Sequence, residues 1–243
     1  MAINVNEVYQ TVLFILNKEQ RGYVTPAEFN KLATQAQLDI FEKYFEDLNQ
    51  QLRIPENDSE YGNRVKTIQE KIAIFEVNEN LTGGSPYDLT ALTHALHRLG
   101  TVEYTAAGSL PVELQETTQH DYNLSSRSKL TAPTTTWPIF TFRDLGQITT
   151  SPDLDPITIF YIKKPTNPIW GYDVGGVGEF VYNEDEYHET TQPTGSINFE
   201  ISSIDQTELI LTILMYAGVI IRDQSIIQAA AGKIAQDNQN EKS

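Results

Sequence analysis

The feature that most constrains this chain is a long amphipathic run at residues 26–53. Apolar side chains recur there every three or four residues, which is the spacing of one face of an α-helix. Thr25 suits a helix cap, Pro26 the first helical position, and Glu28 the closing partner of a capping box. A helix over this range is roughly 42 Å long, and its apolar stripe requires partner helices. The stripe contains Phe29, Leu32, Ala33, Ala36, Ile40, Phe41, Tyr44, Phe45, Leu48 and Leu52.

Helical patterns also occur elsewhere near the two ends of the chain. Residues 5–16 repeat apolar side chains at helical spacing, and residues 64–72 fit a short helix. Residues 209–221 form an apolar face near the C-terminus, and helical spacing resumes after a break at Arg222. Because an amphipathic hairpin must bury its apolar seam, we predict that the N- and C-terminal helices pack against each other as a bundle.

The middle of the chain has a different pattern. Short runs rich in β-branched and aromatic residues alternate with Pro, Gly, Asn and Thr, which is typical of a small sandwich or barrel-like sheet. Residues 111–126 interrupt these runs and fit a helix that starts near Pro111. The predicted strands are 72–77, 101–104, 139–142, 157–162, 179–182 and 196–201.

The predicted fold class is therefore α+β, a helical bundle with an inserted β-rich domain. Residues 1–72 are the N-terminal helical part, 73–202 the inserted domain, and 203–243 the C-terminal helical part. A chain of 243 residues buries roughly 70% of its unfolded surface, so it can build a core of its own.

Composition excludes several classes of function. The chain has 17 Lys and Arg against 33 Asp and Glu, a net charge of −16, and no cysteine. The missing cysteines exclude disulfides, thiolate-ligated zinc and a thiol nucleophile. The negative charge argues against wrapping nucleic acid and against docking on an anionic membrane. The longest apolar run, Leu209–Ile221, is shorter than the roughly 20 residues that a membrane span needs, and residues 1–10 do not resemble a signal peptide.

One local motif resembles a calcium-binding loop. In the loop between the first two predicted helices, Gly22 and Glu28 fall at positions 6 and 12 of an EF-hand. Positions 1, 3 and 5 require oxygen ligands, and Asn17 and Glu19 could supply two of them, but position 5 is Arg21. A helix cap explains the same residues, so we predict no bound metal and keep only the set Asn17, Glu19 and Glu28 as an alternative.

We find no other constellation that indicates catalysis or a cofactor. His94 and His97 lack the HExxH spacing of zinc peptidases, and the glycines of residues 173–178 are not followed by a phosphate-binding GK[ST]. The acidic run 184–189, which contains His188, has the composition of a solvated loop. We therefore predict a protein that is not an enzyme and holds no cofactor.

Four stretches resemble one family of structural proteins. These are FILNKEQRGYVTPAEFNKLATQAQLDIFEKYF (14–45), LTAPTTTWPIFTF (130–142), IFYIKKPTNPIWGY (159–172) and ELILTILMYAGVIIRDQSIIQAAAGKI (208–234). They resemble head–tail adaptor and tail ring proteins of short-tailed bacteriophages, including the crAss-like phages of gut Bacteroidetes. The resemblance implies terminal helices in a bundle with a β-rich domain projecting between them.

The resemblance also implies a function and a set of partners. Such proteins form homo-oligomeric rings, often of twelve copies, below the portal protein. They line part of the channel through which DNA leaves. The implied location is the virion tail or connector, assembled in the host cytoplasm, with portal and other ring proteins as neighbours and no membrane.

The charge fits a channel that does not hold DNA. Residues 1–80 carry −5, residues 81–200 carry −9 and residues 201–243 carry −2, so the β-rich region is predicted to be the most acidic. An acidic wall repels phosphates over about 10 Å at moderate salt. We expect much of this charge to face the channel, and a channel lined by Lys and Arg would contradict that expectation.

Ring closure requires two complementary surfaces on each copy. The long helix and the end of the C-terminal helix offer apolar candidates. The predicted interface residues are Phe29, Phe41, Phe45, Ile226, Ile227 and Ile234.

Two alternatives from other classes remain open. Trp137 and Trp170 could stack on sugars in a tail-associated glycan-binding or host-surface-binding module, which aromatic rings gathered in one exposed groove would favour. A metal-dependent enzyme could instead use the acidic run 184–189 with a histidine.

Overall fold

The chain contains both helices and sheets, which confirms the predicted α+β class. The computed structural model describes residues 2–18, 23–52, 64–106, 108–143, 146–184 and 195–221, together with 228, 231–233 and 235–236. The chain divides into two compact units. The helical unit contains Met1–Ile74 and Pro165–Ser243, and the sheet unit contains Phe75–Lys164.

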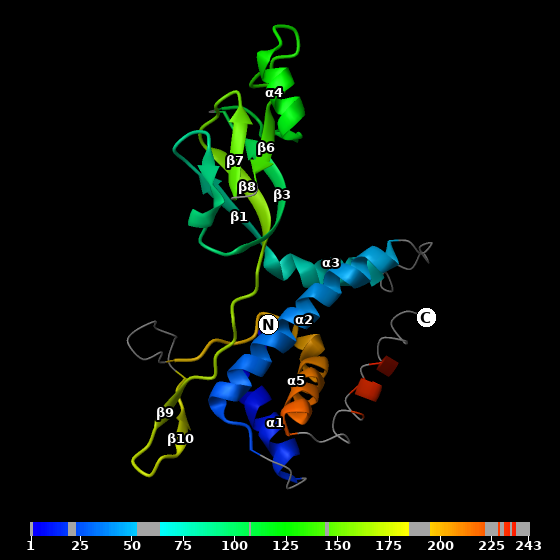
Figure 1. Ribbon diagram of the computed structural model, residues 1–243, viewed down its shortest axis with the longest axis vertical. Helices are drawn as coiled ribbons and strands as arrows, with labels where there is room; N and C mark the ends of the chain where they lie inside the picture. The colour runs from blue at the N-terminus through cyan, green and yellow to red at the C-terminus, as the bar shows by residue number, and fades with distance from the viewer. Residues whose placement is uncertain are drawn as a thin grey trace. The chain divides into compact units, whose positions relative to one another are not determined.

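The helical unit is built from α1 (Val5–Lys18), α2 (Pro26–Gln51), α3 (Arg64–Ile72) and α5 (Gln206–Ile221). Helix α5 packs against α1 and α2, and α3 packs against α2 (Figure 1). The short helix η3 (Ser203–Asp205) leads into α5, and a hairpin of β9 (Tyr172–Val174) and β10 (Phe180–Tyr182) belongs to the same unit. Its buried side chains include Val5, Val8, Val12, Leu16, Phe29, Ile40, Phe41, Phe199, Leu209 and Ile213.

The start of α2 confirms the capping box. The Thr25 hydroxyl accepts the amide hydrogen of Glu28, and the Glu28 carboxylate accepts the amide hydrogen of Thr25 at 2.9 Å. These two bonds satisfy amides that the first turn leaves without helical partners. Because the Thr25 groups donate to it, the pKa of the Glu28 carboxyl is lowered.

The sheet unit contains two four-stranded sheets that share one apolar core. The first sheet has the order β1-β8-β3-β4, and the second has the order β2-β7-β6-β5. Neighbouring strands are antiparallel except β5 and β6. The strands are β1 (Glu76–Leu81), β2 (Tyr87–Asp88), β3 (Leu96–Tyr104), β4 (Val112–Glu113), β5 (Gln115–Glu116), β6 (Ile139–Arg143), β7 (Gln147–Ser151) and β8 (Ile157–Lys163).

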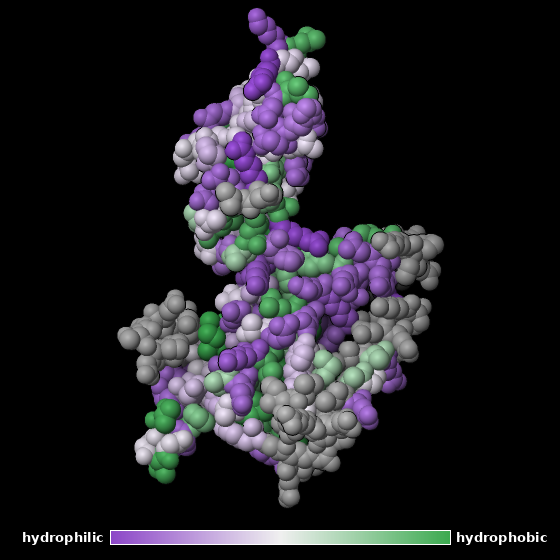
Figure 2. Space-filling view, viewed as in Figure 1, coloured by the Kyte–Doolittle hydropathy of each residue, from purple (hydrophilic) through white to green (hydrophobic). Residues whose placement is uncertain are grey.

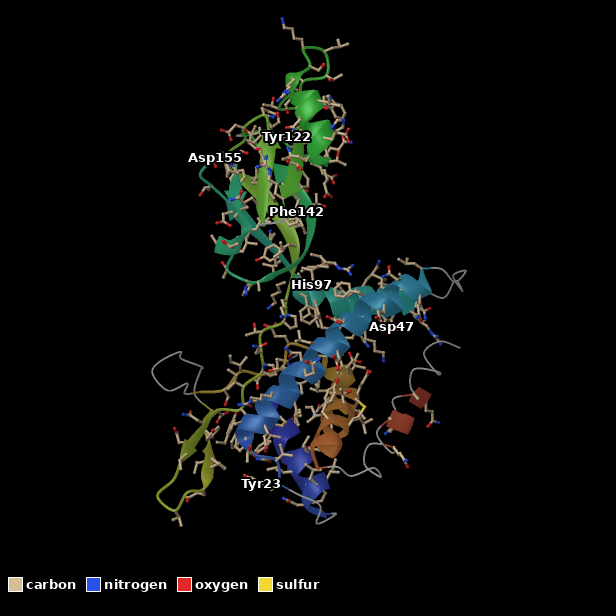
Figure 3. The ribbon with its side chains drawn as sticks, in the orientation of Figure 1. Tyr23, Asp47, His97, Tyr122, Phe142 and Asp155 are labelled. Atoms are coloured by element: carbon tan, nitrogen blue, oxygen red, sulfur yellow. The ribbon has the colours of Figure 1, made fainter. Side chains whose placement is uncertain are left out.

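A helix, α4 (Gln119–Arg127), lies over the second sheet. The Tyr122 hydroxyl, labelled in Figure 3, donates to the carbonyl oxygen of Thr150 in β7 at 2.9 Å. The prediction of a helix over 111–126 is therefore wrong in its first half. There the chain forms β4 and β5, because Val112 pairs with Tyr104 and Gln115 with Ile139 across the sheets.

The predicted boundaries of the inserted domain also need correction. The sheet unit ends at Lys164, whereas the sequence pattern placed the end of the β-rich domain at 202. Residues 165–202 belong to the helical unit because their backbone bonds to its helices. The buried Gln37 of α2 donates to the carbonyl oxygen of Thr166 at 2.7 Å and accepts the amide hydrogen of Glu200 at 3.1 Å.

This boundary moves most of the negative charge into the helical unit. With the observed boundaries, the sheet unit carries ten acidic and six basic residues, a net charge of −4. The helical unit carries the other −12. The β-rich region is predicted to be the most acidic, but the sheet unit carries less negative charge than the helical unit, so this prediction is wrong. Residues 165–200 alone contain seven acidic side chains and no Lys or Arg.

Candidate assembly surfaces

A buried indole anchors the hairpin of β9 and β10 to the helices. Trp170 is 5% exposed, and its ring packs on Tyr9 of α1 with 4.5 Å between centroids. The centre of its ring also lies 5.9 Å from that of Tyr172 and 5.6 Å from that of Tyr182. Such aromatic contacts add to the free energy gained by burial, so the base of the hairpin is held by stacked rings.

Side-chain amides from two helices fix the position of this indole. The Asn30 side-chain oxygen accepts the Trp170 amide hydrogen at 2.8 Å, and its side-chain nitrogen donates to the Trp170 carbonyl at 3.3 Å. The indole Nε1 donates to the side-chain oxygen of Asn6 at 3.1 Å. Asn30 and Gln37 lie seven residues apart, which places them on the same face of α2. Side chains on one face of α2 therefore hydrogen-bond to the backbone of segment 165–202.

The outer part of the hairpin exposes apolar side chains. We call residues 172–182 the arm. Its strands pair Phe180 with Val174 and Tyr182 with Tyr172. Val174 is 65% exposed, Val177 95%, Phe180 39% and Val181 50%, and Figure 2 shows green, apolar atoms along the arm. A two-stranded hairpin is marginal by itself in water, and exposed clusters of this kind mark interaction sites.

A groove of about 520 Å³ lies between the arm and α1. Tyr9 and Leu13 line one side, and Phe180 and Tyr182 line the other. Tyr23, labelled in Figure 3, also lines this groove and is 54% exposed. The arm and the neighbouring end of α1 thus form one largely aromatic surface.

Gly171 is the first residue before the arm, and it has no room for a side chain. A Cβ there would collide with the backbone carbonyl oxygen of Gly195. The Gly171 amide donates to the Ser196 hydroxyl at 3.0 Å, and its carbonyl accepts the Asn183 amide hydrogen at 3.0 Å. These contacts close the base of the arm.

Replacing Gly171 with alanine should therefore lower the free energy of unfolding by about 2 kcal/mol, because the added Cβ would push the backbone at Gly195 away from Gly171. Gly176 is the matched control. A Cβ at Gly176 would meet no atom within 4 Å, so Gly176→Ala should change stability by less than about 0.5 kcal/mol. Urea unfolding followed by circular dichroism gives both values. Equal effects of the two substitutions would contradict the close packing at Gly171.

A second surface lies at α3, which a buried ion pair fixes in place. Lys71 donates to Asp205 Oδ1 at 2.8 Å, and the Tyr44 hydroxyl donates to Asp205 Oδ2 at 2.5 Å. The Lys71 ammonium also lies 5.4 Å from the centre of the Tyr44 ring. Asp205 is 7% exposed, so its charge depends on these partners. The cluster joins α2, α3 and η3.

Helix α3 carries exposed basic side chains and has apolar neighbours. Arg64 and Lys66 are exposed, and Glu70 is the helix's one acidic residue. Among the described α-helices only α3 has a positive net charge. Leu52 and Ile74 are 61% and 44% exposed just beyond the ends of α2 and α3.

Burial raises the pKa of several tyrosines. The pKa of Tyr87 and that of Tyr216 rise to about 12. Tyr216 also donates to Asp39, which disfavours its phenolate further. Burial likewise raises the pKa of Tyr9 and Tyr44.

The raised pKa values predict loss of stability in alkali. A tyrosine in an unfolded chain has a pKa of about 10. Because the folded values are higher, these phenols stabilise the fold fully below pH 10 and lose that contribution as the pH rises toward 12. The ultraviolet absorbance of phenolate should show part of the twelve tyrosines titrating late, and all of them near pH 10 in urea. Uniform titration near pH 10 without urea would contradict the burial.

The sheet unit has exposed apolar side chains of its own. Leu110, Leu124, Leu130 and Trp137 are 84%, 58%, 94% and 79% exposed. Trp137 and Pro138 line a groove of about 700 Å³ with Val112 and Glu113. The two indoles therefore belong to different units, with Trp170 buried and Trp137 exposed.

Three of the predicted interface residues are buried within a single chain. Phe29, Phe41 and Phe45 are 0%, 1% and 7% exposed within a single chain. Their apolar stripe is covered by the chain's own helices, since α2 packs against α3 and α5. This part of the interface prediction is corrected. The other three residues, Ile226, Ile227 and Ile234, lie outside the described residues.

One of the three residues of the calcium-binding alternative, Glu28, is hydrogen-bonded in the helix cap. The Glu28 carboxylate accepts hydrogens from the amide and the hydroxyl of Thr25, at 2.9 and 2.7 Å. Asn17 is exposed, and Glu19 lies outside the described residues. In the part of the chain that the structure describes, no three His, Asp or Glu side chains gather as a metal site would require. The run 184–189 falls outside that part except for Glu184.

The sequence pattern predicts the second strand of the arm but not the first. The predicted strand 179–182 corresponds to β10, whereas β9 and the hairpin turn are not predicted, although Gly-Gly between apolar and aromatic runs is a hairpin signal.

No described helix is long and apolar enough to span a membrane. The sequence matches no protein-family model and no curated protein. The chemistry of the arm therefore carries the functional argument.

Proposed function

We propose that this chain is a virion structural protein that forms a ring in the head–tail connector or tail of a short-tailed phage. In this role it joins the portal protein to the tail and lines part of the DNA-ejection channel. Its chemistry is protein–protein binding. The terminal helices form the bundle of each subunit, and the sheet unit is the domain inserted in it.

The observation that carries this proposal is the arm. Four of its apolar side chains are exposed in an isolated chain, while packing of Trp170 and its bonds to Asn30 anchor the base. An anchored element with an apolar outer part is stabilised when a partner covers it, because that removes apolar surface from water. The net charge of −16 adds a second argument, since an acidic wall lets a duplex slide.

The proposal is tested by the oligomeric state of the chain with and without portal protein. Light scattering of the mixture should give a particle with many copies of this chain for each portal assembly. The chain alone is expected as a ring or as a monomer that awaits the portal as a template. A monomer that persists with the portal would overturn the proposal.

A tail-associated glycan-binding module is the second candidate, and one observation favours it. Trp137 is 79% exposed beside the groove with Val112 and Glu113, and exposed indoles can stack on sugars. Titration with host surface polysaccharide should then quench Trp137 fluorescence, and Trp137→Ala should abolish binding. An unchanged emission spectrum at saturating polysaccharide would exclude this role.

A further inference from the structure

We propose that residues 124–131 of one copy, the end of α4 and the loop after it, dock in the groove beside Trp137 of a second copy. We call residues 124–131 the tip, and the groove of about 700 Å³ beside Trp137 the Trp137 groove. This inference rests on the proposed function, since it names a contact that joins neighbouring subunits. Both surfaces belong to the sheet unit. Because they are different surfaces, the contact can repeat around a ring.

The tip is apolar and basic. Leu124 and Leu130 are 58% and 94% exposed, and Arg127 and Lys129, which lie between them in sequence, are exposed as well. Leu124 and Arg127 are three residues apart and therefore share one side of α4. In the part of the chain that the structure describes, neither cation has an ion pair or a side-chain hydrogen bond. The tip therefore suits a partner that offers both apolar surface and carboxylates.

Hydrogen bonds hold the tip at the outside of the sheet unit. The Tyr122 hydroxyl of α4 donates to the carbonyl oxygen of Thr150 in β7 at 2.9 Å. Leu124 follows Tyr122 by two residues, so it lies on the side of the helix that is turned away from the sheet. After the helix, the Ser128 hydroxyl oxygen accepts the amide hydrogen of Leu130 at 3.3 Å. Figure 1 shows α4 and this loop at one end of the sheet unit.

The Trp137 groove has the complementary chemistry. Trp137 is 79% exposed, and its backbone forms reciprocal hydrogen bonds with that of Thr134, at 3.1 and 3.3 Å. Glu113 and Glu116 line the same groove and are exposed. Among the described residues that line it, none is Lys or Arg. The groove therefore combines an indole with carboxylates, and complementary charge favours a basic occupant.

Two carboxylates at this groove oppose each other without a neutralising cation. Glu113 of β4 lies directly opposite Glu103 of β3 in the antiparallel pair. Like charges in this position destabilise a sheet. Among the residues that the structure describes, neither side chain has an ion pair or a hydrogen bond partner. A cation supplied by another chain would offset this repulsion, which is a second reason to expect a basic occupant.

A single chain leaves both surfaces open. The tip does not fill the groove of its own chain, because Leu130 and Trp137 are 94% and 79% exposed. A contact of tip against tip would bring Arg127 and Lys129 toward the same residues of the other copy, and like charges oppose association. The phosphate backbone of DNA would attract the two cations but would leave the leucines in water. The tip of one copy in the groove of another satisfies the charges and the apolar side chains together.

The first test is cysteine cross-linking between two singly substituted chains, since the chain has no cysteine of its own. Thr131→Cys places a thiol at the tip and Gln115→Cys places one in the groove, and both positions are exposed. One of the two proteins carries a size tag. At about 1 mM protein, where contacts of millimolar affinity form, mild oxidation of the mixture should give mixed disulfide dimers.

The control mixes Thr131→Cys with Thr82→Cys, at a position that is exposed and lies outside the groove. The Gln115 mixture should cross-link on the order of tenfold more than this control, because docking raises the local thiol concentration. Equal yields in the two mixtures, no cross-link in either, or an excess of dimers of Thr131→Cys with itself would overturn the proposal.

Charge reversal on separate chains is the second test. Arg127→Glu with Lys129→Glu reverses the tip, and Glu113→Lys with Glu116→Lys reverses the groove. Within each variant, tip and groove then carry the same sign, so self-association should weaken by about tenfold or more. An equimolar mixture should recover it, because each tip meets an oppositely charged groove on the other variant.

Sedimentation velocity measures the association, and thermal unfolding checks that each variant folds. All four substituted positions are exposed, so the fold should tolerate the changes. Variants that associate as strongly as the unmodified chain, or a mixture as weak as its components, would contradict the pairing of tip and groove. Polysaccharide binding at Trp137 by chains that do not associate would overturn it as well, in favour of the glycan-binding role.

Failure of this contact and failure of the proposed function give different results. A particle formed with portal protein by both charge-reversed variants, without the specific cross-link, would exclude the contact and leave the proposed function standing. A cross-link specific to Thr131 and Gln115, in a chain that stays unbound when portal protein is added, would support the contact and overturn the proposed function.

Discussion

Replacing Lys71 with methionine should lower the free energy of unfolding of the helical unit by about 3 kcal/mol. The substitution keeps the length of the side chain but leaves the Asp205 carboxylate, which is 7% exposed, without its cation. Breaking a buried pair costs more than the pair itself contributes, since one charge stays buried and uncompensated. The Lys71 side chain is 18% exposed, which places the effect at the low end of the known range.

The measurement is urea unfolding in a Trp137→Phe background, where Trp170 is the remaining indole and reports on the helical unit. Lys66→Met on the same helix is the matched control. Lys66 is exposed, so its loss should cost under about 1 kcal/mol. Adding Asp205→Asn to Lys71→Met should recover part of the lost stability, because it removes the unpaired charge. A cost below about 1 kcal/mol for Lys71→Met would contradict the role assigned to the pair.

Replacing Trp170 with alanine should have the largest effect, a loss of about 4 kcal/mol. It removes a buried indole that contacts Tyr9, Tyr172 and Tyr182, and it leaves a cavity at the base of the arm. The arm should then open, so that chymotrypsin cleaves at Phe180 faster than in the unmodified chain.

The chain supplies its own control in Trp137, which is 79% exposed in the sheet unit. Trp137→Ala should change stability by less than about 0.5 kcal/mol and leave cleavage at Phe180 unchanged. Trp170→Phe should fall between the two, because it keeps an aromatic ring but loses the bond from the indole nitrogen to Asn6. Equal losses for Trp170→Ala and Trp137→Ala would refute the anchoring of the arm.

The parts of the fold that rest on local chemistry are predictable from the sequence. The apolar spacing of α2 and the Thr25–Glu28 box depend only on neighbouring residues, and the structure confirms both. Residues 139–143 and 157–163 are likewise strands close to where β-branched and aromatic runs predict them.

The parts that depend on long-range pairing are not predictable in the same way. Val112 and Gln115 lie in a stretch with helical character, yet pairing with Tyr104 and Ile139, eight and 24 positions away, overrides it. The apolar stripe of α2 indicates that Phe29, Phe41 and Phe45 are buried by other residues. The stripe does not indicate whether those residues belong to the same chain or to another copy. In the structure they belong to the same chain.

The anchoring of the arm is not predictable from local patterns, because the residues that anchor it are distant in sequence. Its anchor combines Asn6, Asn30 and Trp170, which are separated by up to 164 positions. Spacing arguments along one element cannot bring these residues together. The acidic charge of residues 165–200 was assigned to the β-rich domain for the same reason, since only the bonds of Gln37 place that segment with the helices.

The central claim is that this chain forms a ring around a DNA channel in a phage particle. Electron cryo-microscopy of the intact particles that carry it tests this most directly, at a resolution that identifies side chains. The result predicted is a closed ring between portal and tail, with more carboxylates than cations facing the channel. A chain absent from the particle, located away from the channel, or lining it with Lys and Arg would contradict the claim.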